Sequence, residues 1–331
     1  MDLSTEYLGL CLPHPFVAGA SSVGDEVDRV RRFADAGIAA VVLRSLFEEQ
    51  IHHEADAHHA AAFGHADAHG EASSYLPEVD GCAFGPDEYL AHLAAVKRAV
   101  AIPVVASLNG CTEAGWVDYA RRLADAGADA IELNLWHVAT DPRVSGAEVE
   151  DLAVATVQSV VGAVRIPVAV KLTASHASLP HFAARLVAAG ARGLVLFNRA
   201  YEPDLDVEAL EVKTHMEWSS QAELRSRLRW LAILSGQVPT GYAASGGVHR
   251  PLDAVKAVMC GAHVLQLVAA VLRGGPSAVG QMVAGLRDWL LTHGYTSLAQ
   301  LRGSMDWHRA PDPRAFERGS YMRLLQTHRM T

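Results

Sequence analysis

The chain has 331 residues, of which 50% are hydrophobic, and a formal net charge of −9 at pH 7. This length is enough to bury one large core, and no linker rich in proline, glycine and serine divides it. The negative charge argues against a nucleic-acid partner, and no apolar stretch approaches the roughly 18 residues of a membrane span. We therefore expect a single cytoplasmic domain, residues 1–331.

A spaced pair of residues repeats four times along the chain. A proline opens an apolar run, and a glycine that ends a helical pattern follows 22 to 24 residues later: Pro15 and Gly37, Pro103 and Gly127, Pro167 and Gly190, Pro239 and Gly261. Proline is tolerated at the first residue of a strand, and glycine is favoured just after a helix. Four such β-α-β units with continuously apolar strands predict an α/β fold, a (β/α)8 TIM barrel.

The predicted elements follow this pattern in chain order. Strands are expected near residues 15–21, 39–45, 102–108, 129–135, 166–172, 192–197, 240–245 and 262–267. Helices are expected near residues 25–36, 87–100, 113–126, 146–164, 179–189, 220–234, 250–260 and 276–292. Beyond Leu298 the chain becomes polar and rich in arginine, so residues 299–331 are predicted to form a surface tail.

The spacing between units shows where the barrel carries extra chain. From each helix-ending glycine to the next proline it is 66, 40 and 49 residues, so long loops follow the second, fourth and sixth strands. Such loops are usually functional, and residues 46–86 are expected to form a lid over the barrel mouth. Six histidines lie between Ile51 and Glu71, but they lack a compact ligand framework, so we favour a solvated lid over a metal site.

Polar groups follow the strands, where a TIM barrel carries its active site. Arg44 and Lys171 end different strands, and both are expected at the inner rim, where they suit an anionic or electron-rich ligand. The alternative is an ordinary ion pair, for which Glu48 and Glu49 lie close to Arg44 in sequence. Ser245-Gly246-Gly247 follows the seventh strand and indicates either a phosphate-binding turn or a tight turn that needs positive φ.

These segments together resemble the class 1 dihydroorotate dehydrogenases, a family of flavin-binding barrels. The resemblance extends over residues 3–275, and the branch of dihydroorotate dehydrogenase-like proteins is the most similar. The segments that carry it are Leu8-Gly9-Leu10-Cys11-Leu12-Pro13-His14-Pro15, Ala18-Gly19-Ala20-Ser21, Val170-Lys171-Leu172, Leu196-Phe197-Asn198-Arg199, Ser245-Gly246-Gly247-Val248, and Gly261-Ala262 before Leu265-Gln266-Leu267.

The resemblance implies flavin mononucleotide (FMN) in the barrel mouth. The positions it assigns to the cofactor are Ala20, Ser21, Arg44, Ser45, Asn134, Lys171, Gly246, Gly247, Val268 and Ala269, the last four around the phosphate. Lys171 has a catalytic role in this scheme, because a cation beside the flavin ring stabilises negative charge on it. Asn109, Asn198 and Arg199 are expected to bind the substrate.

The chain departs from the family at the catalytic base. The dehydrogenases carry a cysteine on the loop after the fourth strand, and here Asn134-Leu135-Trp136-His137 places His137 at that position. The asparagine-rich segment that holds orotate is also missing, so dihydroorotate is not the expected substrate. We expect an FMN-dependent oxidation or reduction of a small polar substrate with a carbonyl or amide group. His137 is chemically suited to proton transfer; the alternative is a loop histidine that stacks on Trp136 or faces solvent.

Two other functions remain open from the sequence. Lys171, desolvated on the fifth strand, suits a flavin-free lyase or aldolase that forms a Schiff base. The missing base suits a catalytically silent barrel that serves as a partner subunit. We also expect a homodimer, while no iron–sulfur or dinucleotide motif identifies an electron partner.

Overall fold

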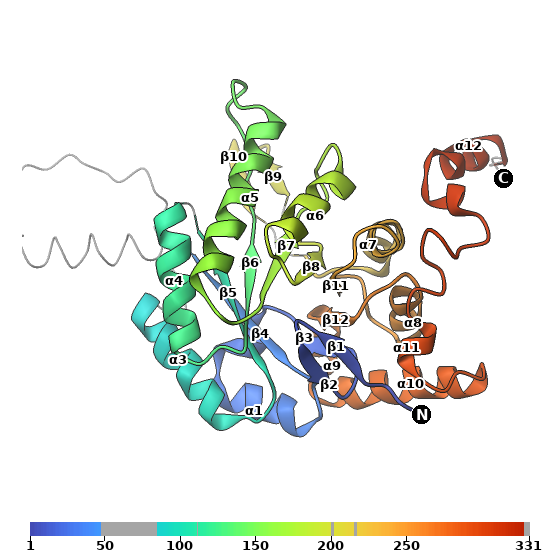
Figure 1. Cartoon of the computed structure of the whole chain (residues 1–331), viewed down its shortest axis with the longest axis horizontal. Coiled ribbons are helices and arrows are strands. Elements are labelled where there is room, and N and C mark those ends of the chain that lie inside the picture. Colours follow the sequence, from blue (N-terminus) through green and yellow to red (C-terminus); the bar gives the residue numbers. More distant parts are fainter. Residues whose placement is uncertain (48–84, 111, 200–201, 215–216, 328–331) are drawn as a thin grey trace, which may run out of the picture.

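The computed structural model describes residues 1–47, 85–110, 112–199, 202–214 and 217–327 (Figure 1). Eight parallel strands close into one barrel in the order β11-β12-β3-β4-β5-β6-β7-β8. The strands are β3 (Phe16–Ala18), β4 (Val41–Phe47), β5 (Val104–Asn109), β6 (Ala130–Asn134), β7 (Val168–Leu172), β8 (Gly193–Leu196), β11 (Gly241–Ser245) and β12 (Val264–Leu267). The predicted (β/α)8 barrel is confirmed, and all eight strands lie where the apolar runs placed them.

Helices surround the barrel and alternate with its strands (Figure 1). They are α1 (Val27–Asp35), α3 (Pro86–Ala99), α4 (Glu113–Asp125), α5 (Gly146–Ala163), α6 (Leu179–Ala188), α7 (Gln221–Ser235), α8 (Pro251–Met259) and α10 (Ser277–Thr292). Helix α5 begins with a capping box, in which the Ser145 hydroxyl accepts from the amide of Glu148 and the Glu148 carboxylate accepts from the amide of Ser145. Each of the eight helices expected from the sequence is present.

Alternation along the barrel strands separates two layers inside the barrel. Val42, Val105 and Ala169 belong to an apolar cluster in its lower part. Ser107 on β5 and Lys171 on β7 lie two residues further along their strands and so face the same side as Val105 and Ala169. In β4 the register shift that follows Val42 brings Ser45 opposite Ser107. The upper part of the barrel is therefore polar, and it opens toward the carboxyl ends of the strands.

A hairpin that the sequence did not predict closes the lower end of the barrel. It consists of β1 (Thr5–Tyr7) and β2 (Leu10–Leu12), which pair antiparallel. A Cβ atom at Gly193 would lie 3.0 Å from the Tyr7 hydroxyl, and one at Gly241 would lie 2.9 Å from the Tyr7 ring. Glycine at these two strand starts lets the Tyr7 side chain enter the barrel.

The chain after the barrel differs from the predicted surface tail. Helix α11 (Leu298–Leu301) buries Leu298 and Leu301, and the amide of Trp307 donates to the carbonyl of Ala232 on α7. Residues up to Ala310 thus pack onto the outer helices, because Leu298 and Leu301 bury apolar side chains among otherwise polar neighbours. The 3-10 helix η2 (Pro313–Phe316) and the exposed helix α12 (Arg318–Thr327) follow, and α12 stands away from the barrel (Figure 1).

The three long connections take different forms. Most of the predicted lid, residues 48–84, lies outside the described residues, and so does its histidine-rich part. After β6 the chain runs through residues 135–145 into α5, which has 18 residues. After β8 it forms a second hairpin, β9 (Pro203–Asp206) with β10 (Glu211–Thr214).

Candidate active site at the carboxyl end of the barrel

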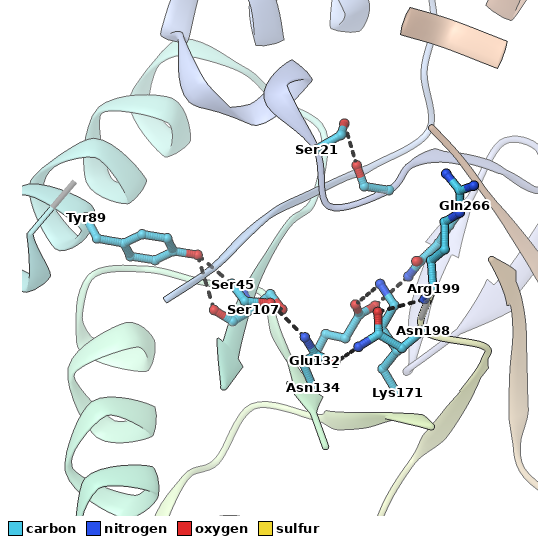
Figure 2. A network of polar contacts seen from close by, with 11 residues as sticks. Ser21, Ser45, Tyr89, Ser107, Glu132, Asn134, Lys171, Asn198, Arg199 and Gln266 are labelled. Carbon is cyan, nitrogen blue, oxygen red and sulfur yellow. Dashed lines mark hydrogen bonds and ion pairs between the residues drawn. The ribbon is translucent and has the colours of Figure 1, made fainter. Parts of the chain in front are cut away.

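A buried ion pair lies in the upper barrel. The Nζ atom of Lys171 on β7 lies 3.1 Å from Oε1 of Glu132 on β6, and the two side chains are only 10% and 2% exposed. The side-chain amide of Gln266 on β12 donates to the other carboxylate oxygen of Glu132. Figure 2 shows these three side chains pointing toward one another from different strands. Each charge needs the other at this depth, because a buried charge without its partner lowers the stability of the folded protein.

A chain of hydrogen bonds runs beside this pair (Figure 2). The hydroxyls of Ser45 and Ser107 lie 2.8 Å apart, and the Asn134 amide donates to Ser45 at 3.4 Å. Asn198 donates to the Asn134 side-chain oxygen at 2.5 Å and accepts from the amide of Arg199 at 2.8 Å. The structure thus brings together Ser45, Asn134, Lys171 and Asn198, four of the residues predicted to form the site.

Arg44 does not join this network. Its Nε atom lies 2.9 Å from Oδ1 of Asp25, and its side chain is 52% exposed. Ser45 faces Ser107 inside the barrel, and Arg44 directly precedes it within the register shift of β4. Among the described residues the acid that pairs with Arg44 is Asp25 after β3, and the expectation that Arg44 and Lys171 both reach the inner rim stays a prediction. Burial raises the pKa of Asp25, and the Arg44 charge opposes that rise.

A tight turn follows β11 at Gly246 and Gly247. Their φ angles are +88° and +85°, and a Cβ atom on Gly247 would lie 2.6 Å from the backbone nitrogen of Leu224. Behind the turn, Arg227 donates from Nε to the carbonyl of Ser245 at 3.0 Å. Burial lowers the pKa of the Arg227 guanidinium, and Glu223 partly restores it. Backbone amides and a buried cation therefore lie at one turn, a combination that favours the binding of an anion.

The ends of β3 and β12 meet on the neighbouring side of the mouth. Ser21 is buried and donates to the carbonyl of Gly19 at 2.9 Å. A Cβ atom on Gly19 would lie 2.9 Å from the side chain of Val268, which directly precedes helix α9 (Ala269–Gly274). The chain segments that hold Ala20 and Ala269 thus approach each other closely across this edge.

The remaining predicted residues lie at the rim. Asn109 is buried at the end of β5 and pairs in register with Phe47. The Arg199 guanidinium lies 3.8 Å from the carboxylate of Glu223 on α7. His137 is exposed on the loop after β6, and among the described residues no hydrogen bond or ion pair engages its ring.

Sequence reasoning missed two polar residues at the centre of the site. Glu132 and Gln266 are 1% and 2% exposed and lie within the apolar segments Ala-Ile-Glu-Leu-Asn and Val-Leu-Gln-Leu. A charged or amide side chain in an otherwise buried strand needs a partner. Glu132 also precedes Asn134 by two positions, which puts both on one face of β6, and this spacing was the available signal.

Comparison with known proteins agrees with this arrangement. A family model described as dihydroorotate dehydrogenase matches residues 82–290. The chain belongs to the dihydroorotate dehydrogenase family. A putative dihydroorotate dehydrogenase A (fumarate) of Aeropyrum pernix is 34% identical over 229 residues, which cover 66% of this chain and 72% of the relative.

More distant members of the family span most of the chain. The NAD-dependent dihydropyrimidine dehydrogenase subunit PreA of Escherichia coli is 24% identical over 91% of this chain and 76% of its own length. The catalytic subunit of dihydroorotate dehydrogenase B (NAD(+)) of Thermoplasma acidophilum is 23% identical over 91% of this chain and 98% of its own. The chain is thus an oxidoreductase of this family. In the described part of the chain, no helix is both long and apolar enough to cross a membrane.

Proposed function

We propose that the protein binds FMN at the carboxyl end of its barrel and uses it to oxidise or reduce a small polar substrate with a carbonyl or amide group. When bound, FMN supplies the acceptor or donor for a two-electron transfer. The observation that carries the proposal is the placement of a glycine turn, suited to a phosphate, and of a buried lysine, suited to an electron-rich ring, at the same mouth of the barrel.

The turn after β11 fits a phosphate group. Gly246 and Gly247 bring no side chain to this turn, and the Arg227 guanidinium lies close behind, with Nη2 3.1 Å from where a Cβ atom of Gly246 would be. In our proposal the amides of Gly246 and Gly247 hold the phosphate, assisted by those of Val268 and Ala269, while Arg227 contributes positive charge. Ala20, Ser21, Ser45 and Asn134 are assigned to the ring and ribityl chain, and Arg44 to the edge of the cofactor site.

Lys171 is assigned to the flavin ring, where its ammonium would stabilise developing negative charge. The pairing with Glu132 holds this ammonium in place and argues against the lyase alternative. An amine forms a Schiff base only through a free lone pair, and an ammonium paired with a buried carboxylate has none. The contact with Gln266 in turn orients the Glu132 carboxylate.

The substrate is assigned to the rim next to Asn134. Asn198 is oriented by its bond to Asn134, and together with Asn109 and Arg199 it offers amide and cationic groups to a carbonyl, an amide or a carboxylate. A dihydropyrimidine, the substrate class in the name of PreA, has this chemistry. Dihydroorotate is disfavoured because the family's cysteine position is occupied by His137, which we assign as the proton-transfer group.

Two further expectations complete the proposal. The protein is expected to act in the cytoplasm as a homodimer. Two of these relatives are named as subunits, so the alternative is that the protein acts as one subunit of a larger enzyme. Co-purification of a second polypeptide with the flavin barrel would favour that alternative.

Flavin reduction tests the assignment of Lys171. In protein reconstituted with FMN, Lys171→Ala is expected to weaken FMN binding or to lower the reduction potential of the bound flavin, since a cation beside the ring is lost. Unchanged affinity and potential would remove Lys171 from the cofactor site. Lys97→Ala is the control, because it removes the same charge from an ion pair with Asp129 at the other end of the barrel.

Anaerobic mixing tests the substrate class. Dihydroorotate is expected to leave the bound flavin oxidised, and rapid bleaching with formation of one orotate per flavin would overturn that expectation. Dihydrouracil is the informative comparison, because it keeps the cyclic amide and lacks the carboxylate. Once a turnover assay exists, His137→Gln is expected to slow the chemical step by about 100-fold or more, and an unaltered rate and pH profile would remove His137 from the mechanism.

A further inference from the structure

A cavity lies at the opposite end of the barrel from the candidate active site. It has a volume of about 1010 Å³ and is bounded by the turn of the β1–β2 hairpin and by the residues that precede β7, β8 and β11. Ligand sites in proteins typically measure about 300–1,000 Å³, so the cavity is large enough for a small organic molecule.

Three arginines line this cavity: Arg165 after α5, Arg192 before β8 and Arg302 after α11. Among the described residues none of the three forms an ion pair with a carboxylate. Glu6 is the one acid in the lining. His263 also lines the cavity, and burial lowers its pKa to about 4, so it adds no charge at neutral pH. A protein with a net charge of −9 therefore concentrates positive charge in this cavity.

Arg302 is the least solvated of the three. Its Nη2 atom donates to the Thr5 hydroxyl at 2.6 Å, while its Nε atom is buried without a hydrogen-bond partner among the described residues. Burial lowers the pKa of its guanidinium. A half-buried guanidinium whose Nε atom has no partner is costly, and an anion in the cavity would offset that cost.

Part of the lining is apolar, and Leu8, Val164 and Ile166 contribute aliphatic side chains to it. We propose that this cavity binds a small organic anion, with a phosphate or carboxylate group held by Arg165, Arg192 and Arg302 and an apolar part against the aliphatic side chains. The site is separate from the cofactor site, and the proposal does not depend on flavin binding.

Calorimetric titration of the purified protein, with FMN in excess to fill any site at the mouth, tests this proposal. Inorganic pyrophosphate and citrate are the probes for phosphate and carboxylate chemistry. We expect at least one of them to bind with one equivalent per chain, and the probe that binds more tightly identifies the head group. Arg192→Gln and Arg165→Gln, which alter exposed side chains, are each expected to weaken binding at least tenfold.

Arg98→Gln is the matched control, because it removes the same charge from the exposed last turn of α3, outside the cavity. It is expected to leave binding unchanged. Failure of both probes to bind at millimolar concentration would overturn the proposal. Binding that Arg192→Gln and Arg165→Gln leave intact would overturn it as well, because the anion would then occupy another place, such as the turn at Gly246.

Discussion

At the scale of single residues, the buried pair of Lys171 and Glu132 determines what the barrel mouth can do. Both groups lie on adjacent strands, with Lys171 in register with Asn134. Their charges are compensated inside the barrel, and Gln266 satisfies the second carboxylate oxygen. A lysine held in this way acts as a fixed positive charge, which is the role proposed for it beside the flavin ring.

Removing one partner of this pair is expected to be strongly destabilising. Lys171→Met leaves the Glu132 carboxylate buried without its cation and should lower the free energy of unfolding by about 3–5 kcal/mol. Adding Glu132→Gln should recover a large part of that loss, because the neutral amide no longer needs the cation. Urea unfolding of the two single variants and the double variant measures the coupling. A Lys171→Met protein as stable as the native one would contradict the pairing.

Tyr7 gives a second test at this scale. Its hydroxyl is buried inside the barrel and has no hydrogen-bond partner among the described residues, and burial raises its pKa. Burying an unpaired hydroxyl costs roughly 1–3 kcal/mol, so Tyr7→Phe is expected to leave stability unchanged or to raise it by about that amount. Urea unfolding is again the measurement. A loss above about 1 kcal/mol would mean that the hydroxyl makes a bond inside the barrel.

The sequence predicted the conspicuous polar residues of the site and missed those that neutralise them. Lys171 and Asn134 were recognised because they end apolar strands. The partner of Lys171 is 39 residues away in sequence, and Asp25, which pairs with Arg44, is 19 residues away, whereas the acids considered from the sequence were the nearby Glu48 and Glu49. Ion-pair partners depend on which strands become neighbours and on which face each residue takes, and both follow from the closed barrel.

At the scale of elements, the turn from β11 to α8 depends on Gly247. Alanine there would place its Cβ atom 2.6 Å from the backbone of Leu224 at φ +85°. Gly37 ends α1 at a similar φ of +88°, but a Cβ atom there would meet no described residue within 4 Å. Alanine substitution at the two positions therefore distinguishes the free-energy cost of a left-handed backbone from that of a steric clash.

We expect Gly37→Ala to lower the free energy of unfolding by about 1 kcal/mol, the usual cost of positive φ. Gly247→Ala should cost more, since the backbone of α7 cannot give way as a flexible side chain would. Thermal and urea unfolding of both variants measure the difference. Equal losses in the two variants would show that the turn after β11 has room for a side chain.

Element positions were predictable because the repeat carries two independent signals, a proline at the strand start and a glycine after the helix. The hairpins were not. Strands β1 and β2 have three residues each and are too short for a periodic pattern. The β9–β10 hairpin exposes Leu205 and Val212, so its apolar residues do not mark a buried face. Tyr7 and Leu8 enter the barrel only because Gly193 and Gly241 leave space.

At the scale of the whole molecule, the buried histidines predict how stability depends on pH. Burial lowers the pKa of His263 from 6.5 to about 4 in the folded protein. Between these values the unfolded chain binds a proton that the folded protein does not, so stability falls as the pH drops through this range. His14 and His176 have pKa values lowered by burial as well and act in the same direction.

Between about pH 7 and about pH 5, His263 alone is expected to remove about 2 kcal/mol from the free energy of unfolding. His263→Asn keeps an acceptor for the Tyr242 amide, which donates to Nδ1 at 3.1 Å, but cannot be protonated. Its unfolding free energy should therefore fall less steeply over the same range. If the unfolding free energies of the native protein and His263→Asn fell in parallel with pH, the pKa of His263 would not be lowered in the folded protein.

Binding of FMN, measured by visible absorbance of the protein after gel filtration, tests the central claim of a flavin site at the barrel mouth most directly. The native chain and Gly37→Ala are expected to retain one equivalent, whereas Gly247→Ala should bind at least tenfold more weakly because its Cβ atom distorts the phosphate turn. A native chain that retains no FMN after micromolar reconstitution would contradict the claim. Full affinity in Gly247→Ala would place any bound flavin elsewhere.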